Sequence, residues 1–226
     1  MKSNSTYIIT IDGTSGSGKS TLSRLLAQKL KFNLLDSGKL YRSAGYIASG
    51  TSKLLKNIKN YKELISTITL KPNHKTYEYE VFHNNNKIDH LLYSESVGET
   101  ASIISKVPEV RKLMFNLQHS CVQGVGLIAN GRDMGSEVFP SAPLKLYVSA
   151  SLEIRARRRF DELIEKGESV IYEDILNSLH KRDESDINRS ISPLKIPDNA
   201  QIIDTSYLKP DAIVDKILNL YTITEN

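Results

Sequence analysis

Three glycines and one lysine fall within nine positions, after the short apolar run YIITI and one aspartate. Residues 13–21 read GTSGSGKST, so Gly13, Gly18, Lys19 and Ser20 have the spacing G-x-x-x-x-G-K-S. Glycines let the backbone curl until successive N–H groups point at one anion, and the start of a following helix adds partial positive charge. Between an expected strand and an expected helix, this spacing predicts a cradle for the phosphates of a nucleoside triphosphate.

The two side chains at the end of this loop have distinct expected roles. Lys19 is placed to reach the outer phosphates, and the Ser20 hydroxyl is placed to hold Mg²⁺. The alternative is a glycine-serine turn without a ligand, which the flanking strand and helix disfavour. The residues expected to bind the triphosphate are Gly13, Thr14, Ser15, Gly16, Ser17, Gly18, Lys19, Ser20 and Thr21.

Arginines outside the loop indicate a second phosphorylated ligand. A kinase must hold two molecules whose phosphates repel one another, and it must exclude water from the reaction. Two candidate clusters, LLDSGKLYR (34–42) and NGRDMG (130–135), each follow an expected strand, where parallel sheets bind ligands. A surface arginine beside a turn, or a structural Arg-Asp pair, is the alternative for each cluster alone. The candidates in these clusters are Ser37, Arg42, Arg132 and Asp133.

A third cluster is expected on helices. In RARRR (155–159) the spacing of three arginines at i, i+3 and i+4 places them on one helix face. If residues 182–189 (RDESDINR) are helical, two arginines and an aspartate share a face there as well. Arginines on a mobile flap can stabilise a transferring phosphoryl group, whereas a solvated charged helix is the alternative. The residues concerned are Arg155, Arg158, Arg159, Arg182, Asp186 and Arg189.

Strand and helix signals alternate along the chain. Strands are expected at 7–11, 32–35, 125–129, 144–149 and 201–204. Between them, apolar residues recur at helical spacing, with Pro108 and Pro210 in first turns, Ser151 as a cap and Gly167 as a stop. This alternation predicts an α/β, three-layer fold with a parallel central sheet flanked by helices.

One segment departs from this alternation. Residues 76–91 (TYEYEVFHNNNKIDHL) alternate in polarity and then reach three asparagines, which predicts an antiparallel hairpin within an insertion at 62–101. Residues 86–89 (NKID) match the guanine-reading pattern of GTPases, the tempting feature of a nucleotide-dependent switch. However, they do not close an apolar strand, and the sequence has no D-x-x-G element. We interpret NKID as turn chemistry.

Composition sets broad limits on the class of protein. A length of 226 residues, 39% of them hydrophobic, suits one domain with a small insertion. The net charge of +4 is too modest to predict a nucleic-acid binder. Cys121 is the single cysteine, and we expect it to be buried and inert. The apolar run before Gly13 is too short for a secretory segment and no stretch could span a bilayer, so we expect a cytoplasmic protein without membrane contact.

Several motifs together resemble the bacterial cytidylate kinases, a family of P-loop nucleoside monophosphate kinases, over residues 7–220. The first motif is common to P-loop proteins, whereas the others in this order are specific. The resemblance implies ATP-dependent, Mg²⁺-assisted phosphorylation of CMP and dCMP by a monomer that binds no nucleic acid. A kinase of UMP or AMP, or a nucleotide-hydrolysing switch, is the alternative. The motifs are IDGTSGSGKST, LLDSGKLYR, SESVGETAS, GRDMG, VFPSAPLKLYV and RDESDINRSISPL.

The resemblance also implies a division of the chain. Residues 1–61 and 102–226 would form the core kinase domain, with a helical lid at about 152–172. Residues 62–101 would form the small antiparallel insert that binds CMP. Two positions depart from the family pattern: Thr14 stands where proline is usual, and Asn130 stands where aspartate is common.

Residue roles follow from the same resemblance. The CMP phosphate would be held by Ser37, Arg42, Arg132 and Arg189. The cytosine edge would be read by Ser102, Arg111 and Asp133, and the ribose would be reached by Arg182 and Asp186. The expected catalytic residues are Lys19, Arg132, Arg155, Arg158 and Arg189.

Overall fold

The computed structural model describes residues 6–49 and 58–225 of the 226-residue chain. The predicted core segment 1–61 includes residues 1–5 and 50–57, which lie outside these ranges. The chain divides into two compact units. One, the hairpin unit, comprises residues 1–7 and 27–129, and the other, the cradle unit, comprises residues 8–26 and 130–226.

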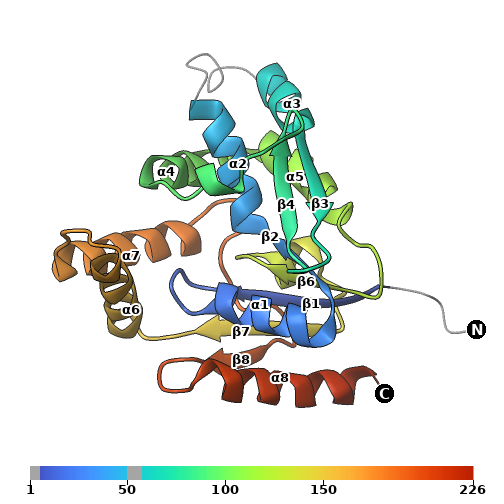
Figure 1. The fold of residues 1–226 in the computed structure, drawn as a ribbon, viewed down its shortest axis with the longest axis vertical. Coiled ribbons are helices and arrows are strands. Elements are labelled where there is room, and N and C mark those ends of the chain that lie inside the picture. The colour runs from blue at the N-terminus through green and yellow to red at the C-terminus, as the bar shows by residue number, and fades with distance from the viewer. Residues whose placement is uncertain (1–5, 50–57, 226) are drawn as a thin grey trace, which may run out of the picture. The chain divides into compact units, whose positions relative to one another are not determined.

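Five strands form the central sheet in the order β2-β6-β1-β7-β8. β1 pairs in parallel with β7, which pairs in parallel with β8 (Figure 1). Every residue of β6 is buried, as expected for a strand covered on both faces. The expected α/β fold with a parallel central sheet is confirmed, and each predicted strand lies within two residues of its observed bounds. The strands are β1 (Tyr7–Gly13), β2 (Asn33–Asp36), β6 (Gly126–Asn130), β7 (Leu144–Ser149) and β8 (Gln201–Asp204).

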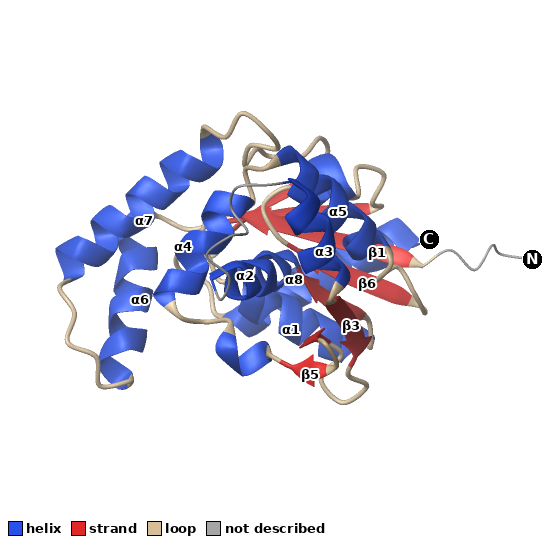
Figure 2. Ribbon diagram, turned by 90° about the horizontal axis from the view of Figure 1, so that it is seen from above, coloured by secondary structure: helices blue, strands red, loops and turns tan. Residues whose placement is uncertain are grey.

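The helix that follows β7 begins and ends at the signals predicted for it. α6 (Leu152–Glu165) is capped by Ser151, whose hydroxyl accepts a hydrogen bond from the Ile154 N–H at 3.3 Å. Gly167 follows its end with a φ of +79°, a conformation that favours glycine. α7 (Tyr172–Ile187) lies beside α6 (Figures 1 and 2). The buried core that these two helices share consists of Ala156, Leu163, Ile175 and Leu179.

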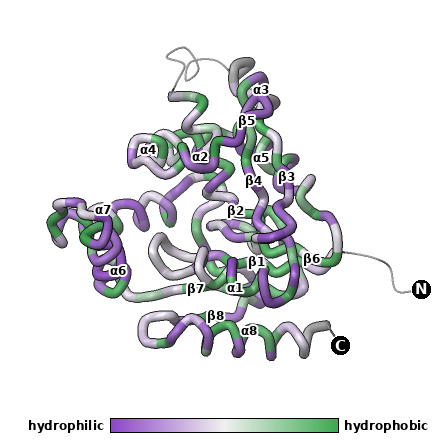
Figure 3. The backbone as a smooth tube through the Cα atoms, viewed as in Figure 1, coloured by the Kyte–Doolittle hydropathy of each residue, from purple (hydrophilic) through white to green (hydrophobic). Residues whose placement is uncertain are grey.

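Two further helices belong to the layers around the central sheet. α1 (Lys19–Leu30) follows β1 directly, and α8 (Pro210–Glu225) begins at the predicted proline. Figure 3 shows polar and apolar residues alternating along α8. Its Ile213, Val214 and Ile217 are buried, which gives this helix one apolar face. Across the described ranges, none of the helices has the length and apolar character needed to cross a bilayer.

Four helices build most of the hairpin unit. A Cβ atom placed on Gly45 of α2 would lie 2.9 Å from the Ala101 nitrogen and the Val97 carbonyl oxygen of α4, so glycine permits this close approach. α5 carries Pro108 in its first turn, as predicted. The helices are α2 (Ser37–Ser49), α3 (Ile58–Ser66), α4 (Glu95–Ile104) and α5 (Pro108–His119).

The small antiparallel sheet expected from the sequence is confirmed in this unit. β4 (Tyr79–His83) and β5 (Asn86–Lys87) form a hairpin whose turn is made by Asn84 and Asn85 at φ 47° and 65°. A strand that the sequence analysis did not predict, β3 (Ile68–Pro72), pairs with the other edge of β4. β4 is therefore the central strand of a three-stranded sheet, and β3 and β5 are its edges.

Candidate active site

The glycine loop lies between β1 and α1, as predicted. A Cβ atom on Gly13 would lie 1.9 Å from the Val148 carbonyl oxygen, so a side chain at this position would collide with β7. Gly16 and Gly18 adopt φ values of +76° and +87°, which L side chains rarely tolerate. The loop can therefore curl tightly and then enter α1 at Lys19, leaving helix N-terminal amides available for an anion.

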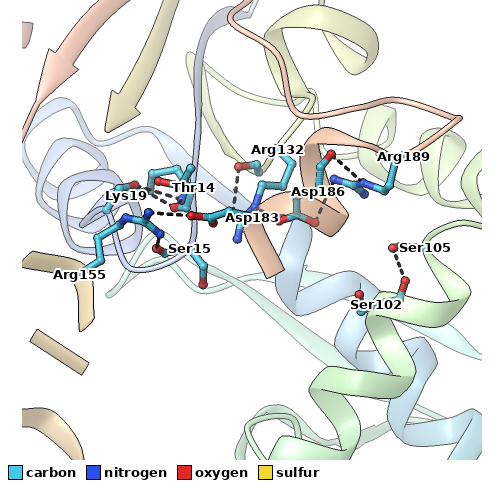
Figure 4. A network of polar contacts seen from close by, with 12 residues as sticks. Thr14, Ser15, Lys19, Ser102, Ser105, Arg132, Arg155, Asp183, Asp186 and Arg189 are labelled. Atoms are coloured by element: carbon cyan, nitrogen blue, oxygen red, sulfur yellow. Dashed lines mark hydrogen bonds and ion pairs between the residues drawn. The ribbon is translucent and has the colours of Figure 1, made fainter. Parts of the chain in front are cut away.

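Lys19 bends back over the loop that precedes it. Its buried ammonium donates to the Thr14 carbonyl and lies 3.3 Å from the Ser17 hydroxyl (Figure 4). The Ser17 hydroxyl in turn donates to the Thr14 carbonyl at 2.9 Å. The lysine charge is thus held beside the backbone that was predicted to surround the phosphates.

A buried carboxylate precedes the loop. Asp12 accepts hydrogen bonds from the backbone N–H groups of Met134 and Gly135, each at 2.7 Å. These two residues begin a short π-helical turn (η3, Met134–Val138) directly after the predicted GRD residues. Burial raises the Asp12 pKa to about 6, although the two amide bonds oppose this shift. Asp12 was missed in the sequence, where its signal is a carboxylate in an otherwise apolar strand.

The expected Mg²⁺-binding serine has a second oxygen-bearing side chain beside it. The Ser20 hydroxyl accepts a hydrogen bond from the Asn130 amide nitrogen at 3.3 Å. Asn130 is buried, and its Oδ1 atom has no hydrogen-bond partner among the described residues. Hydroxyl and amide oxygens suit a hard cation such as Mg²⁺, so these residues fit the ion. The described ranges hold no group of three or more His, Cys, Asp or Glu arranged to bind a metal.

Asp186 joins two of the predicted arginines in the cradle unit. Arg132 Nε lies 2.8 Å from Asp186 Oδ2, and the Arg189 guanidinium lies 3.4 Å from Asp186 Oδ1 (Figure 4). Burial alone would raise the Asp186 pKa, but the Arg132 charge and hydrogen bond and the Arg189 and Arg182 charges hold it below its usual value. α7 ends at Ile187, so Arg189 reaches this carboxylate from beyond the helix.

Arg155 makes three contacts inside the cradle unit. Its NH1 donates to the Ser15 carbonyl of the glycine loop at 3.0 Å, and its Nε donates to the Ala150 carbonyl at 3.0 Å. Its NH2 lies 2.6 Å from Asp183 Oδ2 on α7 (Figure 4). The Arg155 side chain is only 5% exposed, so this ion pair is largely removed from water. Asp183, which the sequence analysis missed, therefore links α7 to the arginine that contacts the loop.

The other two arginines of this helix face have different partners. Arg158 donates to the Thr205 carbonyl at 2.6 Å and to its hydroxyl at 3.3 Å. That hydroxyl donates to the Ser17 carbonyl at 2.9 Å, which brings the end of β8 to the glycine loop. Arg159 is exposed and pairs with Glu162 at 2.9 Å. The three arginines of this helix face therefore each have a different partner.

In the hairpin unit, Ser37 and Arg42 lie on α2. The buried Ser37 hydroxyl accepts a hydrogen bond from the Gln118 amide nitrogen at 2.9 Å. The Arg42 guanidinium donates to the carbonyls of Leu92 at 2.9 Å and Ser94 at 3.3 Å. Both candidate phosphate ligands are therefore held by hydrogen bonds within the hairpin unit.

Ser102 and Arg111 are each hydrogen-bonded to Ser105, which follows α4. The Ser105 hydroxyl donates to the Ser102 carbonyl at 2.9 Å (Figure 4), and Arg111 donates to the Ser105 carbonyl at 3.3 Å. The Arg111 guanidinium also lies 5.8 Å from the centre of the Tyr41 ring, within cation–π range. The two residues expected to read the base thus share Ser105 as a neighbour.

The NKID segment has structural partners. Asp89 accepts a hydrogen bond from the Val81 N–H at 3.0 Å and forms an ion pair with the buried Lys39. Lys87 lies 2.6 Å from Glu80 on the neighbouring strand. Both charged residues of the segment therefore have structural partners, but Asn86 and Lys87 form β5, so the segment follows the turn at Asn84 and Asn85 instead of forming it.

Cys121 is buried, as expected, and burial raises its thiol pKa to about 12. Such a thiol remains protonated near neutral pH and is a poor nucleophile. This finding supports the interpretation of Cys121 as an inert core residue.

A strand, a glycine loop entering a helix with Lys and Ser, and a parallel sheet define a P-loop nucleotide-binding protein. The family model described as cytidylate kinase matches residues 9–223. The chain belongs to the cytidylate kinase family, which confirms the resemblance found in the sequence.

Two curated relatives and one solved structure illustrate the match. A cytidylate kinase of Carboxydothermus hydrogenoformans is 37% identical over 212 residues, covering 94% of this chain and 96% of that protein. A cytidylate kinase of Polynucleobacter necessarius is 38% identical over 214 residues, covering 95% of this chain and 98% of that protein. An uncharacterized protein of Eubacterium ventriosum matches in structure with a TM-score of 0.53 at 14% identity, over 95% of this chain and 97% of that one, a likeness of fold alone.

Proposed function

We propose that this protein transfers the γ-phosphoryl group of ATP to CMP and dCMP, forming CDP and dCDP. The transfer is direct and in line, and no covalent enzyme intermediate forms. The observation that carries this proposal is the curled glycine loop with Lys19 folded over it, in a chain of the cytidylate kinase family. The loop is the proposed binding site for ATP, and membership of the family indicates CMP or dCMP as the acceptor.

The acceptor phosphate needs binding rather than activation. It is already ionised near neutral pH, so a strong general base is not required. Catalysis then consists of positioning and charge neutralisation. Lys19 lies at the loop. Arg132 and Arg189 converge on Asp186, whose carboxylate orients both guanidinium groups. We assign these three cations to the transferring and accepting phosphates.

The proposed CMP ligands are distributed over both units. In the hairpin unit, Ser37 and Arg42 bind the phosphate, while Ser102 and Arg111 read the base. In the cradle unit, Asp133 reads the base, whereas Arg182 and Asp186 reach the ribose. A buried site that must donate to and accept from the amino-pyrimidine edge penalises uracil, whose donor and acceptor are exchanged. The remaining proposed ligands, for the phosphate, are Arg132 and Arg189.

Mg²⁺ is the proposed metal cofactor, held by Ser20 with the amide oxygen of Asn130 beside it. When bound, the ion neutralises charge on the nucleotide phosphates. The support for this assignment is the buried Asn130 Oδ1 atom described above, which has no hydrogen-bond partner among the described residues. An amide oxygen supplies no negative charge, so this chain must hold the ion with fewer protein charges than a carboxylate would provide.

We assign the lid to residues 152–172, which contain α6 and the start of α7. Arg155 and Arg158 tie this segment to the loop and to Thr205. Both arginines are proposed to act on bound ATP, with residues 62–101 as the CMP-binding insert. We further propose that the enzyme is a monomer and works in the cytoplasm. Sedimentation of the purified protein tests the monomeric state.

A coupled assay with ATP and one acceptor at a time tests the proposal. CMP and dCMP should be phosphorylated with a kcat/KM at least about tenfold above that for UMP, AMP and GMP, because unpaired buried polar groups penalise the wrong base. Equal use of all acceptors, or ATP hydrolysis without an acceptor product, would overturn the assignment.

A further inference from the structure

We propose that Gln118 is a positioning residue that fixes the Ser37 hydroxyl as a hydrogen-bond donor toward the phosphate of the acceptor nucleotide. The inference rests on the proposed function, because it takes the CMP phosphate as the ligand of Ser37. It adds a residue outside the motifs found in the sequence, and it explains why a polar side chain is buried on α5.

The two side chains meet inside the hairpin unit. Gln118 is 2% exposed and Ser37 is 3% exposed. The Gln118 Nε2 atom donates to Ser37 Oγ over 2.9 Å, although the residues are 81 positions apart. Gln118 lies in the last turn of α5 and Ser37 is the first residue of α2, so the bond joins the end of one helix to the start of another.

The direction of this bond determines what the hydroxyl can do next. A serine hydroxyl has one proton to donate and two lone pairs that accept. The Gln118 amide occupies one lone pair, so the hydroxyl proton is directed elsewhere. An ionised phosphate has only acceptor oxygens, and a hydrogen bond donated to a charged group is stronger than one between neutral groups. Gln118 therefore prepares Ser37 for an anion.

Packing alone does not account for Gln118. It continues the buried face formed by Val110 and Met114, positions that α5 fills with apolar side chains. An amide in such a place costs free energy unless it is hydrogen-bonded, and an apolar side chain would fill the space without that cost. The retained amide has its partner in Ser37, which indicates a polar role.

The start of α2 offers a second feature that suits an anion. The Lys39 N–H is already bound by Asp36 Oδ1 at 3.2 Å, which caps the first turn. The first N–H groups of a helix lack partners within it and carry partial positive charge. Ser37 stands at this end, so a phosphate that accepts its proton also benefits from the helix terminus.

Gln118→Glu reverses the bond while keeping the size of the side chain. A carboxylate accepts and does not donate, so it would take the Ser37 proton and turn a lone pair toward the phosphate. We expect the KM for CMP to rise about 10- to 100-fold, the range for a lost bond to a charged group. The KM for ATP should stay within about twofold of the wild-type value, because the donor site is untouched.

Two further variants serve as a matched control and as a second test of Gln118. Gln123→Glu makes the same chemical change at an exposed residue, whose amide donates to the Ser120 carbonyl at 2.7 Å, and it should leave both KM values unchanged. Gln118→Met removes the donor without burying a charge, so it remains informative if Gln118→Glu fails to fold. It should raise the KM for CMP about 3- to 10-fold, the range for a neutral hydrogen bond.

A double-mutant cycle decides whether Gln118 acts through Ser37. In a Ser37→Ala background, Gln118→Met should add little to the rise in KM for CMP, because the hydroxyl that it positions is gone. Additive effects, or an unchanged KM for CMP in Gln118→Met, would overturn the inference while leaving the proposed function intact. A wild-type protein that phosphorylates no CMP would instead overturn the proposed function.

Discussion

Arg155 and Asp183 form a buried ion pair of 2.6 Å that joins α6 to α7 within the cradle unit. The same guanidinium group donates to the Ser15 carbonyl, so one side chain connects the helix pair and the glycine loop. The second carboxylate oxygen of Asp183 is buried and has no hydrogen-bond partner within the described ranges. Removing the arginine would therefore leave a carboxylate that is poorly solvated and unneutralised.

Arg155→Ala should lower the free energy of unfolding by about 3–5 kcal/mol, the cost of leaving one partner of a buried pair uncompensated. Urea denaturation measures this change. The matched control is Arg159→Ala, which removes an exposed arginine four positions along the same helix and should cost less than about 1 kcal/mol. Equal losses in the two variants would show that the Arg155 contacts contribute nothing beyond a surface pair.

Arg189→Ala should raise the KM for CMP about 10- to 100-fold and also slow phosphoryl transfer. The reason is the loss of one of two guanidinium groups that Asp186 orients, while Arg132 keeps its bond of 2.8 Å to that carboxylate. Steady-state kinetics with varied CMP and ATP measure both effects. Lys166→Ala, at an exposed residue paired with Glu162, is the control. Unchanged kinetics in Arg189→Ala would remove this residue from the acceptor site.

The buried Lys39–Asp89 pair, which joins α2 to the segment after β5, should contribute more to stability than the exposed Lys87–Glu80 pair of the small sheet. Asp89→Ala leaves the buried Lys39 ammonium unneutralised, so unfolding should become easier by about 3–5 kcal/mol. Lys87→Ala should cost less than about 1 kcal/mol, because the Lys87 side chain is 49% exposed. Thermal or urea denaturation compares the two. A smaller loss in Asp89→Ala than in Lys87→Ala would contradict a structural role for Asp89.

Asp12 should make the stability of the protein fall as the pH rises. Its pKa is raised from 3.8 to about 6, so the folded state binds the proton more tightly than the unfolded state does. The stabilisation is complete below pH 3.8 and is lost as the pH rises through about 6. A shift of this size corresponds to about 3 kcal/mol.

Urea denaturation between pH 4 and 7, in wild type and in Asp12→Asn, measures this contribution. The variant carries no titrating group at this position, so the wild type should lose stability relative to Asp12→Asn across that interval. Parallel curves for the two proteins would show that Asp12 does not titrate there.

The sequence predicted those parts of the molecule whose causes are local. The glycine loop, the proline in the first turn of α5 and the Ser151 cap depend on neighbouring residues, and all three are present. β3 was missed because Ile68–Pro72 is short and is defined by its pairing with β4. α3 and α4 were also missed, although α4 lies within a quoted family motif.

The site was predicted unevenly for the same reason. Clustered arginines and glycines indicate phosphate binding from the sequence alone. The roles of Asp183 and Gln118 instead depend on partners elsewhere in the chain. Asp183 follows Arg182 directly but pairs with Arg155, and the bond of Gln118 spans 81 positions. A polar residue on the apolar face of α5 was the available signal for Gln118.

The most direct measurement follows the phosphoryl group itself. ATP labelled in its γ-phosphoryl group is incubated with Mg²⁺, CMP and the protein, and the labelled products are separated. The account predicts that label appears in CDP, with one CDP formed for each ATP consumed, and that Lys19→Ala lowers the rate by about 10²–10³-fold without unfolding the protein. Label released only as inorganic phosphate, with CMP left unchanged, would contradict it.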